Sequence, residues 1–189
     1  IRVSNCQSVK AIFDGKDTEV DMKPASRMSF PLKKLILNQF PNLEHIWNLN
    51  ADEILSLLDF QEVCTSNCLS LKNLFPTSTS VANHLVKLDV RDCARLVEVF
   101  VEDEAGLKGE TKQFIFLFLT SLTIWRLPEL KYFYHGKHSL EWPMLKHLDI
   151  YHCDQLKLFT TEHHSGEVAD IEDQLGISND QQAIFLVEN

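Results

Sequence analysis

The stretch from Leu85 to Phe100, LVKLDVRDCARLVEVF, carries a pattern that recurs through the rest of the chain. We number its positions from Cys93 as position zero. Apolar residues then occupy positions −8, −5, −3, +3, +6 and +7, which are Leu85, Leu88, Val90, Leu96, Val99 and Phe100. Apolar residues that alternate with other types at −5 and −3 are typical of a short strand with one buried face. The stretch therefore predicts a strand that ends before position zero, then a bend, then more core residues.

Six copies of this pattern occur, with position zero at residues 6, 40, 68, 93, 127 and 153. Four copies have cysteine there, and the copies at Phe40 and Leu127 have a bulky apolar residue followed by proline. The spacing is irregular, but positions 6 and 93 lie 87 residues apart, as do 40 and 127, and 68 and 153 lie 85 apart. A cycle of three repeats thus occurs about twice. Self-similarity of this kind predicts a solenoid of stacked repeats.

The pattern resembles the leucine-rich repeat, L-x-x-L-x-L-x-x-[N/C], with the downstream leucine in C-x-x-L instead of C-x-L. The C-x-x-L form, its alternation with L-P-x-L, and the Ile46-Trp47 and Val99-Phe100 ends are similar to one family in particular. They resemble the repeats of plant intracellular nucleotide-binding leucine-rich-repeat (NB-LRR) disease resistance proteins of the coiled-coil class. The resemblance implies an α/β solenoid with short parallel strands on the concave face, and loops and short helices on the convex face.

The array of about six repeats covers residues 1–160, and two further parts are expected after it. Residues 161–183 hold a run from Glu162 to Asp180 with six acids and no lysine or arginine, which predicts a mobile acidic loop. Residues 184–189 are expected to begin a further repeat, so the chain is expected to be a fragment of a longer array. Short convex helices are expected within 48–58 and over Val81 to Val86.

Composition limits the classes of binding partner and favours one cellular compartment. A net charge of −9 argues against a nucleic-acid groove or an anionic membrane surface, and no apolar run approaches the roughly 20 residues of a membrane span. Four of the five cysteines share the inward position zero, while Cys64, at position −4, is expected to face outward. Free thiols and the lack of an N-x-S/T sequon favour a reducing, cytoplasmic location.

The sequence offers no pattern for catalysis, for a cofactor or for a metal ion. A glycine-rich phosphate loop and a G-x-S-x-G elbow are both missing from it. Six histidines lie near Cys153 in the last third, but that cysteine is expected to point into the core, so we interpret them as surface residues. We therefore expect no enzyme activity. The resemblance places ADP or ATP in a nucleotide-binding domain outside this chain.

The expected functional site is a protein-binding surface on the concave side of the strands. If positions −5 and −3 point inward, positions −6, −4 and −2 point outward, and equivalent positions form rows across strands roughly 4.8 Å apart. The last three repeats contribute Lys87, Ser121 and His147 at −6, Asp89, Thr123 and Asp149 at −4, and Arg91, Trp125 and Tyr151 at −2. Arginine, tryptophan and tyrosine dominate interface hot spots, and arginine above an indole gains roughly 0.5–1 kcal/mol. The alternative is that Trp125 only covers its neighbours as surface packing.

Two functions remain open. The resemblance implies a recognition and autoregulatory domain of an innate immune receptor in plant defence. Its protein partners would be a pathogen effector, a host protein that the receptor guards, or the receptor's own nucleotide-binding domain. The other reading is a generic leucine-rich-repeat scaffold, or an adaptor that selects substrates, without an immune role. Both readings expect protein partners, no nucleic acid and no transmembrane segment.

Overall fold

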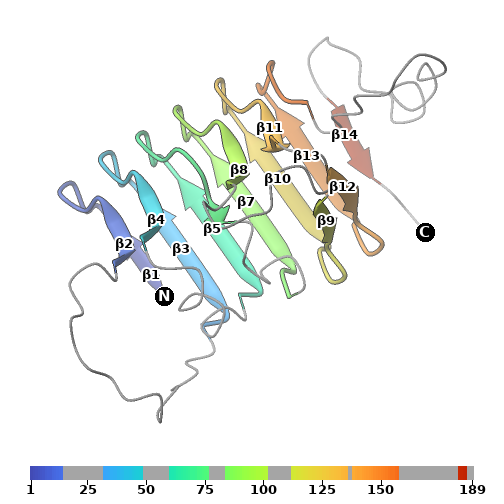
Figure 1. Ribbon diagram of the computed structural model, residues 1–189, viewed down its shortest axis with the longest axis horizontal. Coiled ribbons are helices and arrows are strands. Elements are labelled where there is room, and N and C mark those ends of the chain that lie inside the picture. The colour runs from blue at the N-terminus through green and yellow to red at the C-terminus, as the bar shows by residue number, and fades with distance from the viewer. Residues whose placement is uncertain are drawn as a thin grey trace.

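The largest element of the molecule is a seven-stranded sheet (Figure 1). The computed structural model describes residues 1–14, 32–48, 60–76, 84–101, 112–135, 138–157 and 183–186. Six parallel strands follow one another in chain order: β1 (Arg2–Ser4), β3 (Lys34–Asn38), β5 (Glu62–Ser66), β7 (Lys87–Arg91), β10 (Ser121–Trp125) and β13 (His147–Tyr151). The seventh, β14 (Ala183–Leu186), pairs antiparallel with β13 and so differs from the repeat strands in direction. Residues 161–182 and 187–189 lie outside the described residues.

The register of the six parallel strands follows the repeat frame of the sequence. Leu35 pairs with Val63, Val63 with Leu88, and Leu88 with Leu122, which are all residues at position −5. Every one of these strands ends at position −2, two residues before the cysteine or bulky residue at zero. Because each repeat adds one strand in the same register, any given position forms a continuous row across the molecule.

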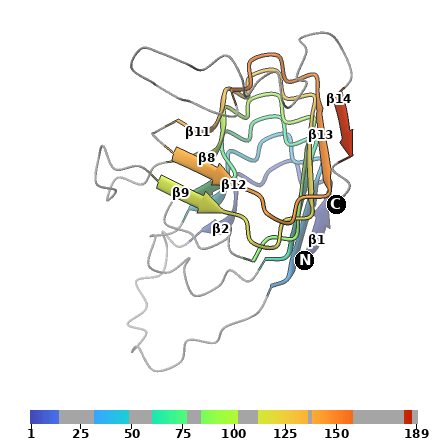
Figure 2. The same cartoon turned by 90° about the vertical axis from the view of Figure 1, so that its right-hand side faces the viewer.

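Short strands, and not helices, form the other side of each coil in the described residues (Figure 2). They make three parallel sheets: β2 (Ala11–Asp14) with β4 (His45–Asn48), β6 (Phe75–Pro76) with β8 (Glu98–Val101) and β11 (Tyr132–Tyr134), and β9 (Lys112–Ile115) with β12 (His138–Glu141). Aromatic and β-branched residues dominate these segments and favour extended backbone. Of the expected helices, residues 49–58 and 81–83 lie outside the described part, and residues 84–86 form a turn and a bend instead.

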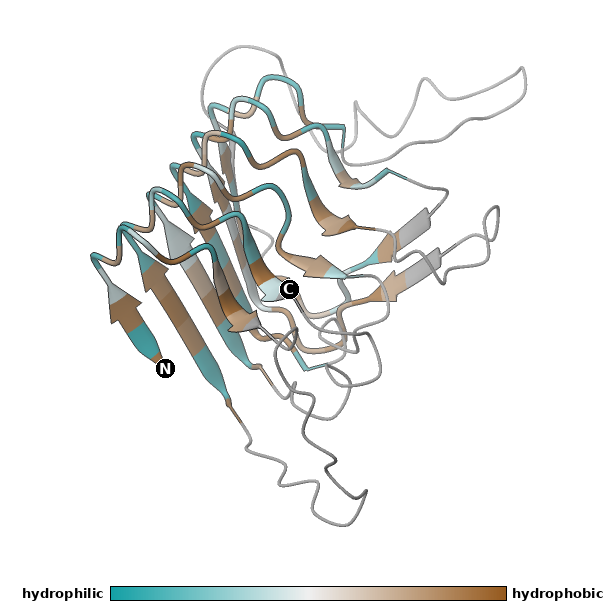
Figure 3. Ribbon diagram, turned by 60° about the vertical axis from the view of Figure 1, so that its left-hand side comes forward, coloured by the Kyte–Doolittle hydropathy of each residue, from teal (hydrophilic) through white to brown (hydrophobic). Residues whose placement is uncertain are grey.

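The core lies between the large sheet and the short strands, where inward residues of all coils meet (Figure 3). In the second to fifth coils, the leucines at −5 and +3 and the zero residues Phe40 and Leu127 are fully buried. Aromatic rings continue the contact from coil to coil: the ring centroid of Phe100 lies 5.3 Å from that of Phe75 and 6.2 Å from that of Phe133. Because each coil packs on its neighbours in this way, apolar contact extends along the whole stack.

The cysteines at position zero close the bend after each strand. Cys93 is fully buried, and its thiol donates to the carbonyl oxygen of Arg91 at 3.3 Å; Cys68 donates likewise to Ser66 at 3.6 Å. A hydrogen bond with Cys68, together with burial, raises the pKa of Cys93 well above its usual value. All five cysteines are free thiols. The four cysteines at position zero fill the core and donate to a backbone carbonyl oxygen.

The residue at position −1 turns the chain by taking a left-handed backbone conformation in every repeat. These residues are Asn5, Gln39, Asn67, Asp92, Arg126 and His152, with φ between 51° and 61°. Such a conformation is unfavourable for residues other than glycine, and least so for Asn, Asp and His. A ladder of hydrogen bonds holds this conformation in the first five coils, because each −1 amide there donates to a carbonyl of the next coil, as Asp92 does to Trp125 at 3.0 Å.

Candidate protein-binding surface

The outward face of the large sheet presents three rows of side chains, as the sequence predicts. Strands β5 and β7 have buried residues at −5 and −3, with partly exposed residues between them. Register places the nine predicted residues of β7, β10 and β13 directly beside one another: Lys87, Ser121 and His147; Asp89, Thr123 and Asp149; Arg91, Trp125 and Tyr151. The three strands therefore bring together one continuous patch of these residues.

Arg91 is held in place by the acid two residues before it. Its Nε lies 2.6 Å from Oδ1 of Asp89, and its Nη2 lies 3.2 Å from Oδ2, so the pair is bidentate. The Asp89 side chain is only 14% exposed and also lies 3.7 Å from the Lys87 ammonium. These hydrogen bonds raise the pKa of the Arg91 guanidinium above its usual value. The cation is thus oriented before any partner arrives.

Trp125 sits between this cation and a second aromatic ring. The Arg91 guanidinium carbon lies 5.6 Å from the indole centroid, which is within the range of a cation–π contact. The ring centroids of Trp125 and Tyr151 are 4.9 Å apart, with an angle of 51° between the planes. The indole N–H is buried and has no hydrogen-bond acceptor among the described residues. The predicted succession of cation, indole and phenol is therefore a row of direct contacts.

Thr123 occupies an outward position of the strand, as predicted, but it is almost completely buried. Only 4% of the residue is accessible, because it lies in the middle strand and the middle row, with neighbours on every side. Its hydroxyl donates to Oδ2 of Asp149 at 3.5 Å. Ser121 is half-buried and His147 is exposed. The accessible part of the patch is consequently its rim and the Arg91–Trp125–Tyr151 row.

The first three strands carry different chemistry in the same rows. At −2, Ser66 donates a hydrogen bond to Oδ1 of Asn38 at 2.8 Å, and at −6, Lys34 forms an ion pair with Glu62. Cys64 lies in the outward −4 row, as predicted, and it is half-buried. Burial, with a further contribution from Asp89, raises the pKa of this thiol. This half of the face offers no aromatic side chain.

Two charged features on the turns were not among the predicted site residues. Arg126 forms a bidentate ion pair with Asp92, at 2.6 and 3.0 Å, between the −1 positions of neighbouring coils. Position +4 carries lysine in four of the six coils, and a groove opens beside it. Sequence reasoning followed the strand positions and left the turns aside. The residue types at −1 and +4, aligned in the same repeat frame, are the sequence signal for both features.

Metal ligation and membrane insertion find no support in the described part of the chain. There, no group of three or more histidine, cysteine, aspartate or glutamate side chains is placed to hold a metal ion. Within the same residues, no helix has the length and apolar character needed to span a bilayer.

Comparison with known proteins gives one family match. The family model described as plant disease resistance protein RPS2-like, leucine-rich repeats, matches residues 1–89 and residues 79–166. The first window contains the zero positions 6, 40 and 68, and the second contains 93, 127 and 153, so each spans one cycle of three repeats. No curated protein and no solved structure matches the chain.

Proposed function

The chain belongs to the leucine-rich repeats of RPS2-like plant disease resistance proteins, and from this premise we propose that it recognises proteins and restrains signalling within a plant immune receptor. In this proposal the coils are part of a solenoid, and the receptor is cytoplasmic and of the coiled-coil NB-LRR class. Its nucleotide-binding domain binds ADP or ATP. The repeats act through protein contact and perform no catalysis.

The observation that supports a contact surface is the Arg91–Trp125–Tyr151 row. Binding normally costs conformational entropy, because long side chains must be ordered at the interface. Here Asp89 fixes the guanidinium, and the guanidinium and the Tyr151 ring both contact the indole, so part of that ordering already exists in the free chain. Preorganised arginine and aromatic side chains are the usual anchors of an interface.

The charges around this row indicate how a partner would be oriented. Lys87 and Arg91 share Asp89, and Asp149 lies on the far side of Thr123. Both signs of charge are therefore present within three strands. Such a patch selects partners by electrostatic complementarity in addition to apolar contact. A pathogen effector, a guarded host protein and the receptor's own nucleotide-binding domain are the candidate partners.

The test uses the complete gene product that contains this chain, expressed in leaves. Trp125→Ala and Arg91→Ala are compared with Arg2→Ala, a matched control because Arg2 is an exposed arginine in the outward −4 row of the first strand. Two quantities are measured: cell-death signalling without a pathogen, and co-precipitation of the nucleotide-binding segment. We expect the first two variants to release signalling or to lose the contact, while the control does neither.

Circular dichroism of the purified 189-residue chain checks that each variant keeps its fold. If both β7–β10 variants fold and behave like the control in signalling and in co-precipitation, the restraint role is wrong. A chain without an immune role, acting as a scaffold or adaptor, would then be the better reading. The family match weighs against that second reading.

A further inference from the structure

A row of lysines runs across the coils on the turn side, away from the outward face of the large sheet. It consists of the residues at position +4, which are Lys10, Glu44, Lys72, Val97, Lys131 and Lys157. Backbone hydrogen bonds fix this register, because each +4 amide donates to the +4 carbonyl of the preceding coil at 2.7 to 3.3 Å. We call these six residues the +4 row. Its side chains are therefore held on adjacent coils along the whole stack.

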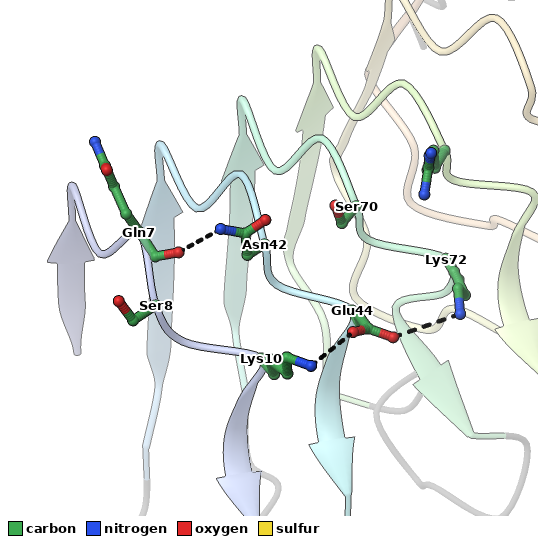
Figure 4. Close-up of a pocket in the computed structure, with 8 residues that line it drawn as sticks. Gln7, Ser8, Lys10, Asn42, Glu44, Ser70 and Lys72 are labelled. Carbon is green, nitrogen blue, oxygen red and sulfur yellow. Dashed lines mark hydrogen bonds and ion pairs between the residues drawn. The ribbon is translucent and has the colours of Figure 1, made fainter.

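The +4 row is strongly basic within an acidic chain. It has four lysines and one acid, which gives a net charge of +3, whereas the whole chain has a net charge of −9. Glu44 is shared between two lysines, with its oxygens 3.8 Å from the Lys10 ammonium and 3.6 Å from the Lys72 ammonium (Figure 4). Lys131 and Lys157 are exposed and have no acidic partner among the described residues. The row therefore carries uncompensated positive charge.

An open groove of about 440 Å³ borders the first part of this row. Lys10, Glu44 and Lys72 line it together with Arg95 and several small polar residues (Figure 4). Arg95 is exposed and forms no hydrogen bond or ion pair with any described residue. With Arg95, the first four coils have three cations beside the groove, which gives a ligand a concave path along the lysines.

We propose that the +4 row and its groove bind an acidic, extended segment of a separate partner protein. Six coils at about 4.8 Å per step span roughly 24 Å, which is the length of about seven extended residues at 3.3 Å each. A short segment along the row meets the lysines, Arg95 and a single acid, Glu44, which is already paired with two lysines. A nucleic acid or a membrane would also meet the rest of this acidic chain and be repelled by it. This site is independent of the Arg91–Trp125–Tyr151 row, which lies on the strands.

The test measures binding of a fluorescein-labelled peptide of seven glutamates to the 189-residue chain by fluorescence anisotropy. The variant Lys131→Glu/Lys157→Glu reverses two charges of the row. The matched control is Lys33→Glu/Lys146→Glu, which changes the net charge of the chain by the same amount. Both of these lysines are exposed and lie at position −7, before the strands begin. We expect the row variant to weaken binding by about tenfold or more and the control by less than about twofold, because close charge pairs dominate over net charge.

Glu44→Gln gives a second and opposite readout. It removes the only acid of the row and frees two lysines, so we expect peptide affinity to rise by about threefold, with a steeper loss on adding salt. Equal weakening by the row variant and its control would overturn the proposal, as would a wild-type chain that does not bind the peptide at low salt. Tighter binding of oligothymidylate or of phosphatidylserine vesicles than of the peptide would also overturn it.

Discussion

The two halves of the outward sheet face share one backbone but differ in side chains. In β1, β3 and β5 the −2 row reads Ser4, Asn38 and Ser66, while in β7, β10 and β13 it reads Arg91, Trp125 and Tyr151. In both halves the residue at −1 has a left-handed backbone conformation, and −1 amides donate hydrogen bonds to the neighbouring coil. The inward positions thus set the fold everywhere, and the outward positions are left to give each half its own surface.

The largest expected effect is on partner binding, and it should differ between a variant in the second half of the sheet face and one in the first. Trp125→Ala removes an indole that contacts both Arg91 and Tyr151, and we expect at least a tenfold loss of contact with the nucleotide-binding segment, or about 1.4 kcal/mol. Asn38→Ala, at the same row position in β3, is expected to change it by less than about twofold, because Asn38 makes only a neutral hydrogen bond to Ser66. Quantitative co-precipitation measures both. Equal losses would mean that the two halves act as one surface.

Sequence reasoning could predict this difference because rows depend only on the repeat frame. Once position zero is known, the period of two in a strand fixes which residues face outward, and equal register fixes their neighbours. The contact between Arg91 and Trp125 follows from these two facts, and the structure confirms it. No such rule gives side-chain rotamers. The bidentate pair with Asp89 within one strand, and the near-complete burial of Thr123, therefore had to come from the structure.

The turns were less predictable than the strands for a different reason. Three of the six −1 residues are Asn or Asp, which tolerate positive φ, but Gln39 and Arg126 give no such signal. Their conformation is imposed by the stack, since their amides must reach the next coil. The predicted convex helices rested on capping residues and short apolar runs. Residues 84–86 form a turn and a bend, while residues 49–58 and 81–83 lie outside the described part. The described segments of that side pair as strands across coils.

The next prediction concerns the residues at position −1 and compares the free energy of unfolding of one variant in each half. Gln39→Gly replaces a residue at φ 61° by one without a steric penalty there, and we expect the free energy of unfolding to rise by about 1 kcal/mol. Arg126→Gly gains the same relief but loses the bidentate ion pair with Asp92, so its net change is expected to be about half as large or less. Urea denaturation of both variants measures the difference. A greater gain for Arg126→Gly would show that the ion pair contributes nothing.

A smaller effect on stability is expected from replacing the Arg91 guanidinium by a lysine ammonium. Arg91→Lys keeps the charge but cannot form the bidentate contact with Asp89, and we expect a loss of about 0.5 kcal/mol in unfolding free energy because the pair is partly exposed. Arg2→Lys is the matched control in the first strand and is expected to have no measurable effect. The two variants are compared by thermal denaturation at low and high salt. A salt-independent loss for Arg91→Lys would point to packing on the indole instead of the ion pair.

The smallest change in stability is expected from the most extensive substitution. The triple variant Ser4→Arg, Asn38→Trp, Ser66→Tyr places the chemistry of the second half on the rows of the first. It removes the hydrogen bond between Ser66 and Asn38, a loss of about 1 kcal/mol, and adds an aromatic pair worth about the same. Because the two terms cancel and none of these positions faces the core, urea denaturation should give a free energy of unfolding that differs by less than about 0.5 kcal/mol from that of wild type. A loss of several kcal/mol would mean that the outward residues of the first half help to specify the fold, and that the two halves differ in more than their surfaces.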